Sequence, residues 1–282
     1  MKENNMDFFG GSSNYVVTDA LKSSVNVAIA LQKPLLIKGE PGTGKTMLAE
    51  AISEALGKKL LVWGIKSTTK AHEGLYVYDT VQRLYDSQFG EGNVADIKQY
   101  IKLGKLGEAF AADEQVVLLI DEIDKADLEF PNDLLWELDK MEFYVNETRE
   151  TIKTKHRPIV IITSNAEKEL PDAFLRRCIF HYIEFPTIEK MREIIDVHFE
   201  KVEENLCEKA LEAFYNIRKM DDIQKKPSTS ELLDWLQALI ISGIDVEEIA
   251  KEIPFVGVLL KKNQDIDAMQ EIKTKGYSLR RW

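Results

Sequence analysis

The sequence predicts an α/β fold, in which helices flank a parallel β-sheet and a smaller all-helical domain follows. Up to Pro186, short apolar runs alternate with segments whose apolar residues recur at helical spacing, which is typical of a parallel sheet covered by helices. After Pro186 the helical spacing continues without a strong strand signal. We therefore expect an α/β domain at residues 1–190, a helical domain at 191–260 and a C-terminal tail at 261–282.

The elements of the α/β domain follow from these patterns in chain order. Helices are predicted at 17–31, 47–56, 94–103, 106–112 and 132–141, and buried strands at 35–37, 60–65, 116–120, 159–162 and 179–185. The run at 116–120 is entirely apolar, as expected of a central strand that is buried on both faces. Residues 142–155 predict a surface hairpin, and residues 66–95 are interpreted as an insertion or a hairpin.

Four further helices are predicted after Pro186, at 187–200, 207–218, 229–241 and 245–253. Ser228 or Thr229 is expected to be the N-cap of the third, because hydroxyl side chains accept hydrogen bonds from the first free backbone amides of a helix.

Composition and charge narrow the classes of function. The 282 residues carry a formal net charge of −11, which argues against a chain whose whole surface binds nucleic acid or an anionic membrane. Its cysteines, Cys178 and Cys207, form neither a disulfide framework nor a metal cluster and are expected to be reduced. We see no signal peptide and no apolar stretch long enough for a membrane span, and so expect a soluble, cytoplasmic protein.

A phosphate-binding loop is predicted between the first strand and the helix that follows it. The pattern G-x-x-x-x-G-K-[ST] is matched by Gly39, Glu40, Pro41, Gly42, Thr43, Gly44, Lys45 and Thr46. Glycines allow backbone amides to surround phosphates, and the helix N-terminus adds partial positive charge. Lys45 is expected to contact the β- and γ-phosphates, and Thr46 to bind Mg²⁺. The sequence thus predicts binding of a nucleoside triphosphate.

Two acids follow the central strand at 116–120. Ligands of parallel sheets bind beyond the carboxyl ends of the strands, so Asp121 is expected to face the phosphate loop and to hold Mg²⁺. Glu122 would accept a proton from the attacking water as a general base. A signalling GTPase orients this water with a glutamine, so a second acid favours ATP. Asp124 is interpreted as a capping or solvated residue rather than a ligand.

A side-chain amide follows the next strand. Asn165 ends the run 159–165 and would position the lytic water between Glu122 and the γ-phosphate. The alternative is an asparagine that simply favours a turn after a strand. Of the two, we prefer the functional interpretation.

These motifs in this order resemble the AAA+ ATPases, which are P-loop NTPases. The stretches GEPGTGKT, VVLLIDEID, IVIITSN and LPDAFLRRC carry the resemblance, and DEIDKA, NDLL and LPDAFLRR are most similar to the MoxR family of the dynein-related AAA subgroup. The resemblance covers residues 17–186 and extends loosely to the helical domain, which would be a lid. It implies that Asn165 is the sensor-1 residue and that Arg176 or Arg177 is an arginine finger reaching a neighbouring subunit, while the other arginine pairs with a nearby acid.

One departure concerns the lid. Family members often carry a sensor-2 arginine in a Ser-Pro-Arg stretch, whereas residues 227–232 read PSTSEL and contain no arginine. Another residue would then have to contact the γ-phosphate, or hydrolysis couples differently to lid motion.

The resemblance implies a chaperone-like ATPase that works as an oligomeric ring, as a hexamer, and remodels or activates a partner complex. Such ATPases often work with a partner that carries a von Willebrand factor A domain. The alternative is a motor or loader acting on nucleic acid, with the basic residues of the hairpin on phosphates: Arg149, Lys153, Lys155, His156 and Arg157. A third possibility, a scaffold that binds ATP with negligible turnover, is disfavoured by Lys45, Glu122 and Asn165.

Overall fold

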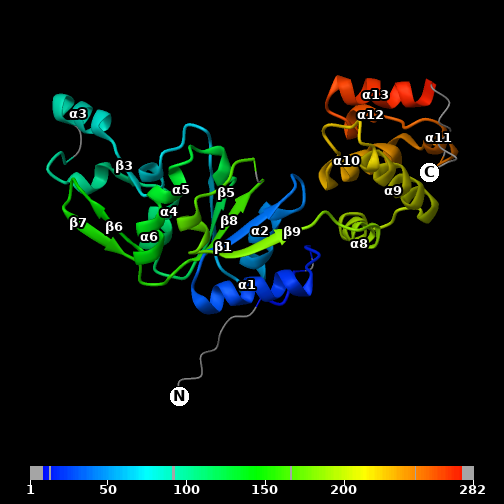
Figure 1. Cartoon of the computed structure of the whole chain (residues 1–282). Helices are drawn as coiled ribbons and strands as arrows, with labels where there is room; N and C mark the ends of the chain where they lie inside the picture. Colours follow the sequence, from blue (N-terminus) through cyan, green and yellow to red (C-terminus); the bar gives the residue numbers. More distant parts are fainter. Residues whose placement is uncertain (1–8, 13, 91–92, 166, 245, 275–282) are drawn as a thin grey trace, which may run out of the picture. The chain divides into compact units, whose positions relative to one another are not determined.

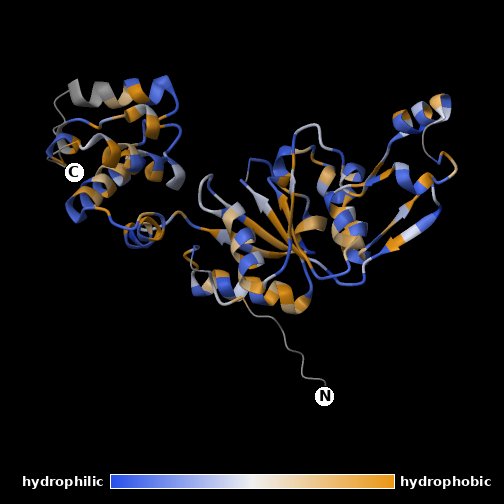
Figure 2. Ribbon diagram, turned by 180° about the vertical axis from the view of Figure 1, so that it is seen from behind, coloured by the Kyte–Doolittle hydropathy of each residue, from blue (hydrophilic) through white to orange (hydrophobic). Residues whose placement is uncertain are grey.

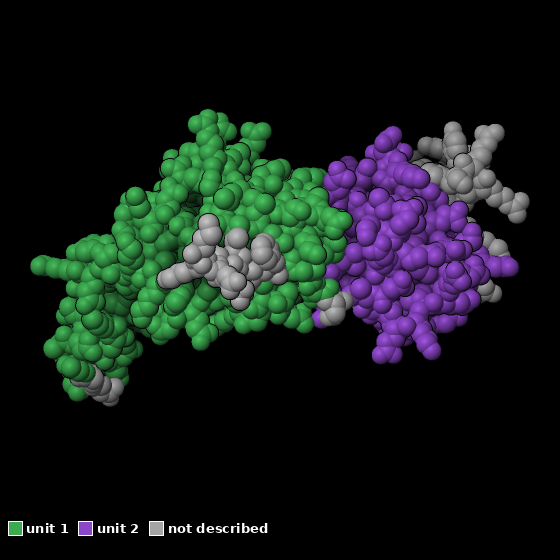
Figure 3. Space-filling view, turned by 90° about the horizontal axis from the view of Figure 1, so that it is seen from below, with its two compact units in different colours: residues 1–12, 17–39, 44–183 green, residues 13–16, 40–43, 184–282 purple. Residues whose placement is uncertain are grey.

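The computed structural model describes residues 9–12, 14–90, 93–165, 167–244 and 246–274. Contacts divide the chain into two compact units, coloured separately in Figure 3. Unit 1 comprises residues 1–12, 17–39 and 44–183, and unit 2 comprises residues 13–16, 40–43 and 184–282. The domain limits at 190 and 260 remain predictions.

Unit 1 contains a five-stranded parallel sheet in the order β2-β5-β8-β1-β9 (Figure 1). Its strands are β1 (Leu35–Gly39), β2 (Leu60–Gly64), β5 (Val117–Asp121), β8 (Ile159–Ser164) and β9 (Ile179–Ile183). β5 and β8 are interior strands, and Figure 2 shows the sheet as mostly hydrophobic. The α/β prediction with parallel strands is confirmed.

Helices cover both faces of this sheet (Figure 1). They are α1 (Asp19–Leu31), α2 (Lys45–Leu56), α4 (Lys105–Ala111), α5 (Phe130–Asp133), α6 (Leu135–Lys140) and α7 (Asp172–Leu175). Leu36 and Ile162 are register partners and share one apolar cluster with Phe110 of α4 and Phe130 of α5. The helix predicted at 132–141 is divided between α5 and α6 at Leu134.

Residues 71–103 form an insert between β2 and α4. It contains η1 (Ala71–Gly74), β3 (Tyr76–Tyr78), α3 (Thr80–Phe89), η2 (Ile97–Tyr100) and β4 (Ile101–Leu103). The helix predicted at 94–103 is wrong, because Ile101–Leu103 pairs antiparallel with Tyr76–Tyr78 and so forms a strand. The helix α3 was not predicted.

The hairpin predicted at 142–155 is formed by β6 (Glu142–Val145) and β7 (Glu150–Lys153). One face is anchored in unit 1, since Phe143 and Val145 are buried and the Tyr76 ring stacks on Phe143. The hairpin is therefore exposed on one side only.

From Glu184 onwards, the regular elements among the described residues of unit 2 are helices. Its helices are α8 (Ile188–His198), α9 (Glu204–Lys219), α10 (Thr229–Ser242), α11 (Val246–Lys251), α12 (Val256–Leu259) and α13 (Asn263–Thr274). Trp235 is fully buried in their core, and its indole N–H donates to the Pro254 carbonyl at 2.6 Å. The N-cap prediction for α10 is confirmed at Ser228, which forms a capping box with Glu231. None of the described helices is long and apolar enough to cross a membrane.

Candidate nucleotide site

The loop between β1 and α2 has the backbone that the phosphate-loop pattern requires. Gly42 and Gly44 have φ angles of 74° and 81°, which glycine adopts without the strain that other residues would incur. Lys45, at the N-terminus of α2, is buried, and its ammonium group donates to the Gly39 carbonyl at 2.9 Å. The loop therefore combines permissive glycines with a lysine held close to the backbone.

The tip of this loop, residues 40–43, is grouped with unit 2. The Thr43 hydroxyl donates to the Glu40 carbonyl at 2.9 Å, and the Glu40 carboxylate accepts from the Arg218 guanidinium at 2.7 Å. Arg218 also lies over the Phe185 ring. Pro41, which follows Glu40 in the chain, is exposed. The structure thus pairs Glu40 with an arginine of α9 that the sequence analysis did not single out.

At the start of α2, the Thr46 hydroxyl lies beside the Asp121 carboxylate. Their oxygen atoms are 3.1 and 3.3 Å apart, although 75 residues separate them in the chain. Asp121 ends β5, and Thr46 follows the loop that begins at the end of β1. Mg²⁺ prefers hard oxygen ligands and usually takes only one or two from the protein, so this pair fits a magnesium site completed by phosphates and water.

Glu122 follows directly and has a left-handed backbone, with φ 58° and ψ 50°. One carboxylate oxygen accepts from the Asn165 amide at 3.0 Å, and the other is paired with the Lys125 ammonium group. The bond to Glu122 raises the pKa of Lys125. The structure thus brings together Asp121, Glu122 and Asn165, as the motifs predict, and adds Lys125.

Thr163 is a further polar residue of this group that the sequence analysis missed. It is fully buried in β8, between β5 and β1. Its hydroxyl donates to Asp121 at 2.6 Å and accepts from the Glu122 amide at 2.8 Å. A threonine at the end of an apolar run, two residues before Asn165, was the available signal. We call the four residues Asp121, Glu122, Thr163 and Asn165 the site edge.

Asp124 is neither solvated nor the cap of a helix. It is 3% exposed, and its two carboxylate oxygens accept the backbone amides of Asn165 at 3.3 Å and Glu167 at 2.9 Å. The interpretation of this residue as capping or solvated needs correction, because its partners lie in the loop that follows β8.

The two arginines after α7 differ. Arg177 donates to the Asp139 carboxylate at 2.7 Å and to the Ala173 carbonyl at 2.8 Å. Arg176 is exposed and has no side-chain partner within the described part of the chain. The expectation that one of them pairs with a nearby acid fits Arg177.

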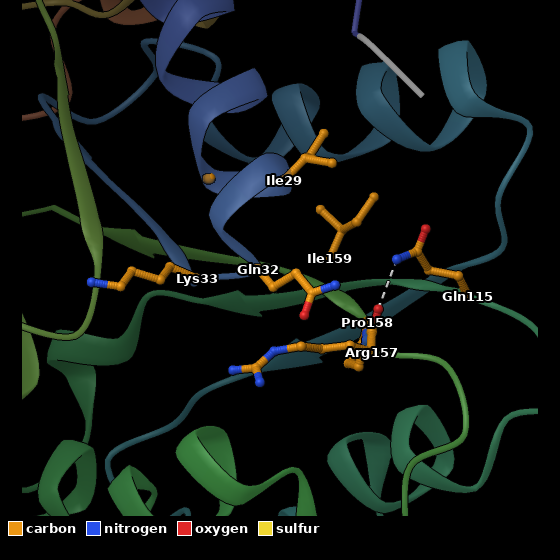
Figure 4. A pocket seen from close by; sticks show the side chains of 8 residues that line it. Ile29, Gln32, Lys33, Gln115, Arg157, Pro158 and Ile159 are labelled. Atoms are coloured by element: carbon orange, nitrogen blue, oxygen red, sulfur yellow. Dashed lines mark hydrogen bonds between the residues drawn. The ribbon is translucent and has the colours of Figure 1, made fainter. Parts of the chain in front are cut away.

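A small cavity lies at the opposite edge of the sheet, at the amino ends of its strands (Figure 4). Gln32, Lys33, Gln115 and Arg157 line it, and Gln115 donates to the Arg157 carbonyl at 2.8 Å. Its volume of about 10 Å³ suits a single water molecule. It is separate from the site edge, which lies at the carboxyl ends of β5 and β8.

We compared the chain with known proteins to find its family. The chain is similar to pachytene checkpoint protein 2 of Saccharomyces cerevisiae, with 26% identity over 208 residues, which are 65% of this chain and 34% of the yeast protein. The chain thus spans about a third of that relative's length.

The fold is similar to that of RuvB from Thermotoga maritima. One point mutant of that protein aligns with a TM-score of 0.56 and 15% identity over 85% of this chain and 71% of that chain. A second point mutant aligns with a TM-score of 0.53 and 14% identity over 87% of this chain and 72% of that chain. At this identity the likeness concerns the fold alone.

Residues 34–178 match the family described as AAA domain (dynein-related subfamily). The match includes the phosphate loop, β5, β8 and both arginines, and it extends over more than half of the 282 residues. The chain therefore belongs to the dynein-related subfamily of AAA domains.

Proposed function

We propose that this chain is a magnesium-dependent ATPase of the MoxR type, in which the site edge activates water against a triphosphate held by Gly39–Thr46. The observation that carries the proposal is the pair of contacts at the ends of β5 and β8. Thr46 lies 3.1 Å from Asp121, and Asn165 lies 3.0 Å from Glu122. One pair suits a metal and the other a water molecule.

In the proposed reaction the loop amides and Lys45 bind the β- and γ-phosphates. Thr46 and Asp121 would hold Mg²⁺, which supplies charge neutralisation on the phosphates. Glu122 accepts a proton from water while the water oxygen forms a bond to the γ-phosphorus. The bond from this phosphorus to the β,γ-bridging oxygen breaks, and ADP and inorganic phosphate leave. The Asn165 amide orients the water and the Glu122 carboxylate.

Glu122 supports ATP over GTP as the substrate, because signalling GTPases orient water with a glutamine. It is half-buried and linked to Lys125, so it must exchange this partner for water before it acts as a base. Lys125 then remains close as a counter-charge.

Arg176 is the better candidate for an arginine finger. A finger must be free to reach the phosphates of another subunit, where it stabilises transition-state charge. Arg177 is held by Asp139 and Ala173 of its own chain, whereas Arg176 is exposed. This assignment requires an oligomeric ring, for which we propose a hexamer.

The biological role that fits this machinery is remodelling or activation of a partner protein complex. The similarity to pachytene checkpoint protein 2 supports membership of the AAA group, and the MoxR-like stretches in residues 121–177 support the narrower type. A protein with a von Willebrand factor A domain is the proposed partner, since the net charge of −11 leaves acidic surface for a metal-dependent adhesion fold.

A nucleic-acid motor is the second candidate, and RuvB of Thermotoga maritima is described as a Holliday junction branch migration motor. The hairpin gives this alternative little support. Lys153 is paired with Glu142 at 3.2 Å, Lys155 with Asp113 at 2.7 Å, and Arg157 is partly buried with a bond to the Leu138 carbonyl. DNA that stimulates turnover with a steep salt dependence would favour the motor.

The decisive experiment compares Glu122→Gln with Glu129→Gln, an exposed acid of the same unit. Loss of a general base is expected to lower the turnover number by about 10²–10⁴-fold while the affinity for ATP is retained. Glu129→Gln should match the wild type in both measurements.

Lys45→Ala should weaken ATP binding by on the order of tenfold or more, since a charged hydrogen bond contributes about 1.5–3 kcal/mol. Wild-type protein that binds ATP without turnover would instead identify a scaffold.

A further inference from the structure

We propose that Asp124 is a positioning residue for hydrolysis, which holds the loop after β8 so that the Asn165 amide meets the Glu122 carboxylate. The inference rests on the proposed ATPase function. It adds a residue that contacts neither nucleotide nor metal and that acts through Asn165.

Burial and geometry distinguish Asp124 from the other acids near the site. At 3% exposure, a carboxylate must be compensated by hydrogen bonds. Its two oxygens take one backbone amide each, from Asn165 and from Glu167, 41 and 43 residues further along the chain. A carboxylate that accepts two amides in this way holds the backbone at Asn165 and at Glu167.

This fixed backbone carries the catalytic amide. The Asn165 backbone N–H donates to Asp124, and its side-chain amide donates to Glu122, two residues before Asp124. A second contact also joins the loop after β8 to the loop after β5: the Lys168 ammonium group donates to the Ala126 carbonyl at 2.8 Å. The loops after β5 and β8 are thus joined by the bonds of Asp124 and of Lys168, and those of Asp124 are the buried ones.

The rate of hydrolysis should be sensitive to the position of the Asn165 amide. A displacement of about 1 Å between reacting groups costs on the order of 10²-fold in rate. Replacing one carboxylate oxygen by an amide nitrogen presents an N–H group to a backbone N–H group, so one of the two bonds must break. The loop then loses one anchor, while Lys45, Thr46 and Asp121 keep the contacts described above.

The test compares Asp124→Asn with Asp127→Asn in the full chain. Asp127 is a matched control, because it is exposed and three residues away, with a partner in Lys70 at 3.5 Å. We expect Asp124→Asn to lower kcat by about 10- to 100-fold with the affinity for Mg·ATP within about threefold of the wild type. Asp127→Asn should leave both values unchanged.

A double-mutant cycle separates positioning from general weakening. If Asp124 acts through Asn165, then Asp124→Asn/Asn165→Ala should have the same kcat as Asn165→Ala within about threefold. The proposal would be overturned if the two substitutions lowered kcat multiplicatively. It would also be overturned if Asp124→Asn left kcat unchanged or lowered nucleotide affinity as much as kcat.

Lys168→Ala keeps the proposal testable if Asp124→Asn does not fold. Lys168 is exposed, so its removal should spare stability, and it should lower kcat by several-fold at unchanged affinity. An unaltered kcat in this variant would then count against the proposal. The proposed function fails separately, if the wild type does not hydrolyse ATP or if Glu122→Gln retains full turnover.

Discussion

The site edge and the insert, both in unit 1, place polar and apolar side chains in opposite ways. At the site edge, polar groups follow buried apolar strands and bond to one another. In α3 of the insert, the buried residue is Asp86, whereas large apolar residues are exposed at helical spacing: Val81, Leu84, Tyr85 and Phe89. Figure 1 shows α3 away from the central sheet.

The contrast separates two uses of buried polar groups. Asp86 accepts from Gln82 and from the buried Tyr100 hydroxyl, each at 2.8 Å, and so attaches α3 to η2. The site edge instead orients groups that would touch nucleotide and water. Substitutions at or beside the site edge should therefore change turnover, whereas those in the insert should change stability and leave turnover unaltered.

The largest effect is expected where turnover depends on an exposed group that reaches another subunit. Arg176→Ala should lower kcat by about 10³-fold or more, as for other arginine fingers. Arg177→Ala removes an exposed ion pair with Asp139 and should cost only about 0.2–1 kcal/mol of stability. Steady-state kinetics of both variants at a concentration that maintains the oligomer provide the check. Equal losses of turnover would refute the distinction.

Thr163→Val should affect turnover and stability together. The variant keeps the side-chain shape but leaves the Glu122 amide without its acceptor, and Asp121 keeps only the Thr46 hydroxyl as a donor. We expect a loss of about 1–3 kcal/mol in unfolding free energy and a higher magnesium requirement for turnover. Magnesium titrations alongside denaturant unfolding measure both, with Thr163→Ser, which keeps the hydroxyl, as the control. A wild-type magnesium dependence in Thr163→Val would show that the hydroxyl does not position Asp121.

In the insert, Asp86→Ala should lower stability without changing turnover. It leaves the Tyr100 hydroxyl buried without its acceptor, at a cost of about 1–3 kcal/mol. The midpoint of thermal unfolding and kcat are the two readouts. A fall in kcat with unchanged stability would break the comparison, because Asp86 would then belong with the functional residues.

The smallest effect is expected on the exposed face of α3. Leu84 is 59% exposed, so Leu84→Ala should change the unfolding free energy by no more than about 0.5 kcal/mol. Leu106 of α4 is fully buried, and Leu106→Ala, the same chemical change, should cost about 2–5 kcal/mol. Denaturant unfolding of the pair measures the difference. Similar losses would mean that the α3 face is covered in solution.

The sequence predicted the structure well where a motif requires one particular backbone geometry. Glycines at φ above 70°, a lysine at a helix N-terminus and acids at the end of an apolar strand follow from the chemistry of a phosphate loop beside a parallel sheet. The parallel sheet and Ser228 as an N-cap are likewise local consequences of pattern.

The rest depends on contacts between segments far apart in the chain. The run Ile101–Leu103 has helical spacing with its neighbours and becomes a strand only because Tyr76–Tyr78 pairs with it. The helix α3 was not predicted, and its large apolar residues face solvent instead of the core. Asp124 has its partner Glu167 in the loop after β8, and Thr163 of β8 has its partner Asp121 at the end of β5, so both pairs join segments more than 40 residues apart in the chain.

Strand order has a consequence for the growing or shortened polypeptide. β8 lies between β5 and β1, although it is formed by residues later in the chain than either. Because neighbouring strands are about 4.8 Å apart, a chain that ended before Ile159 would leave its phosphate loop and its acidic pair on strands with a gap of roughly 10 Å to fill. Such a fragment would contain both sequence signatures and still lack the residues that unite them, so synthesis must pass Asn165 before a working centre exists.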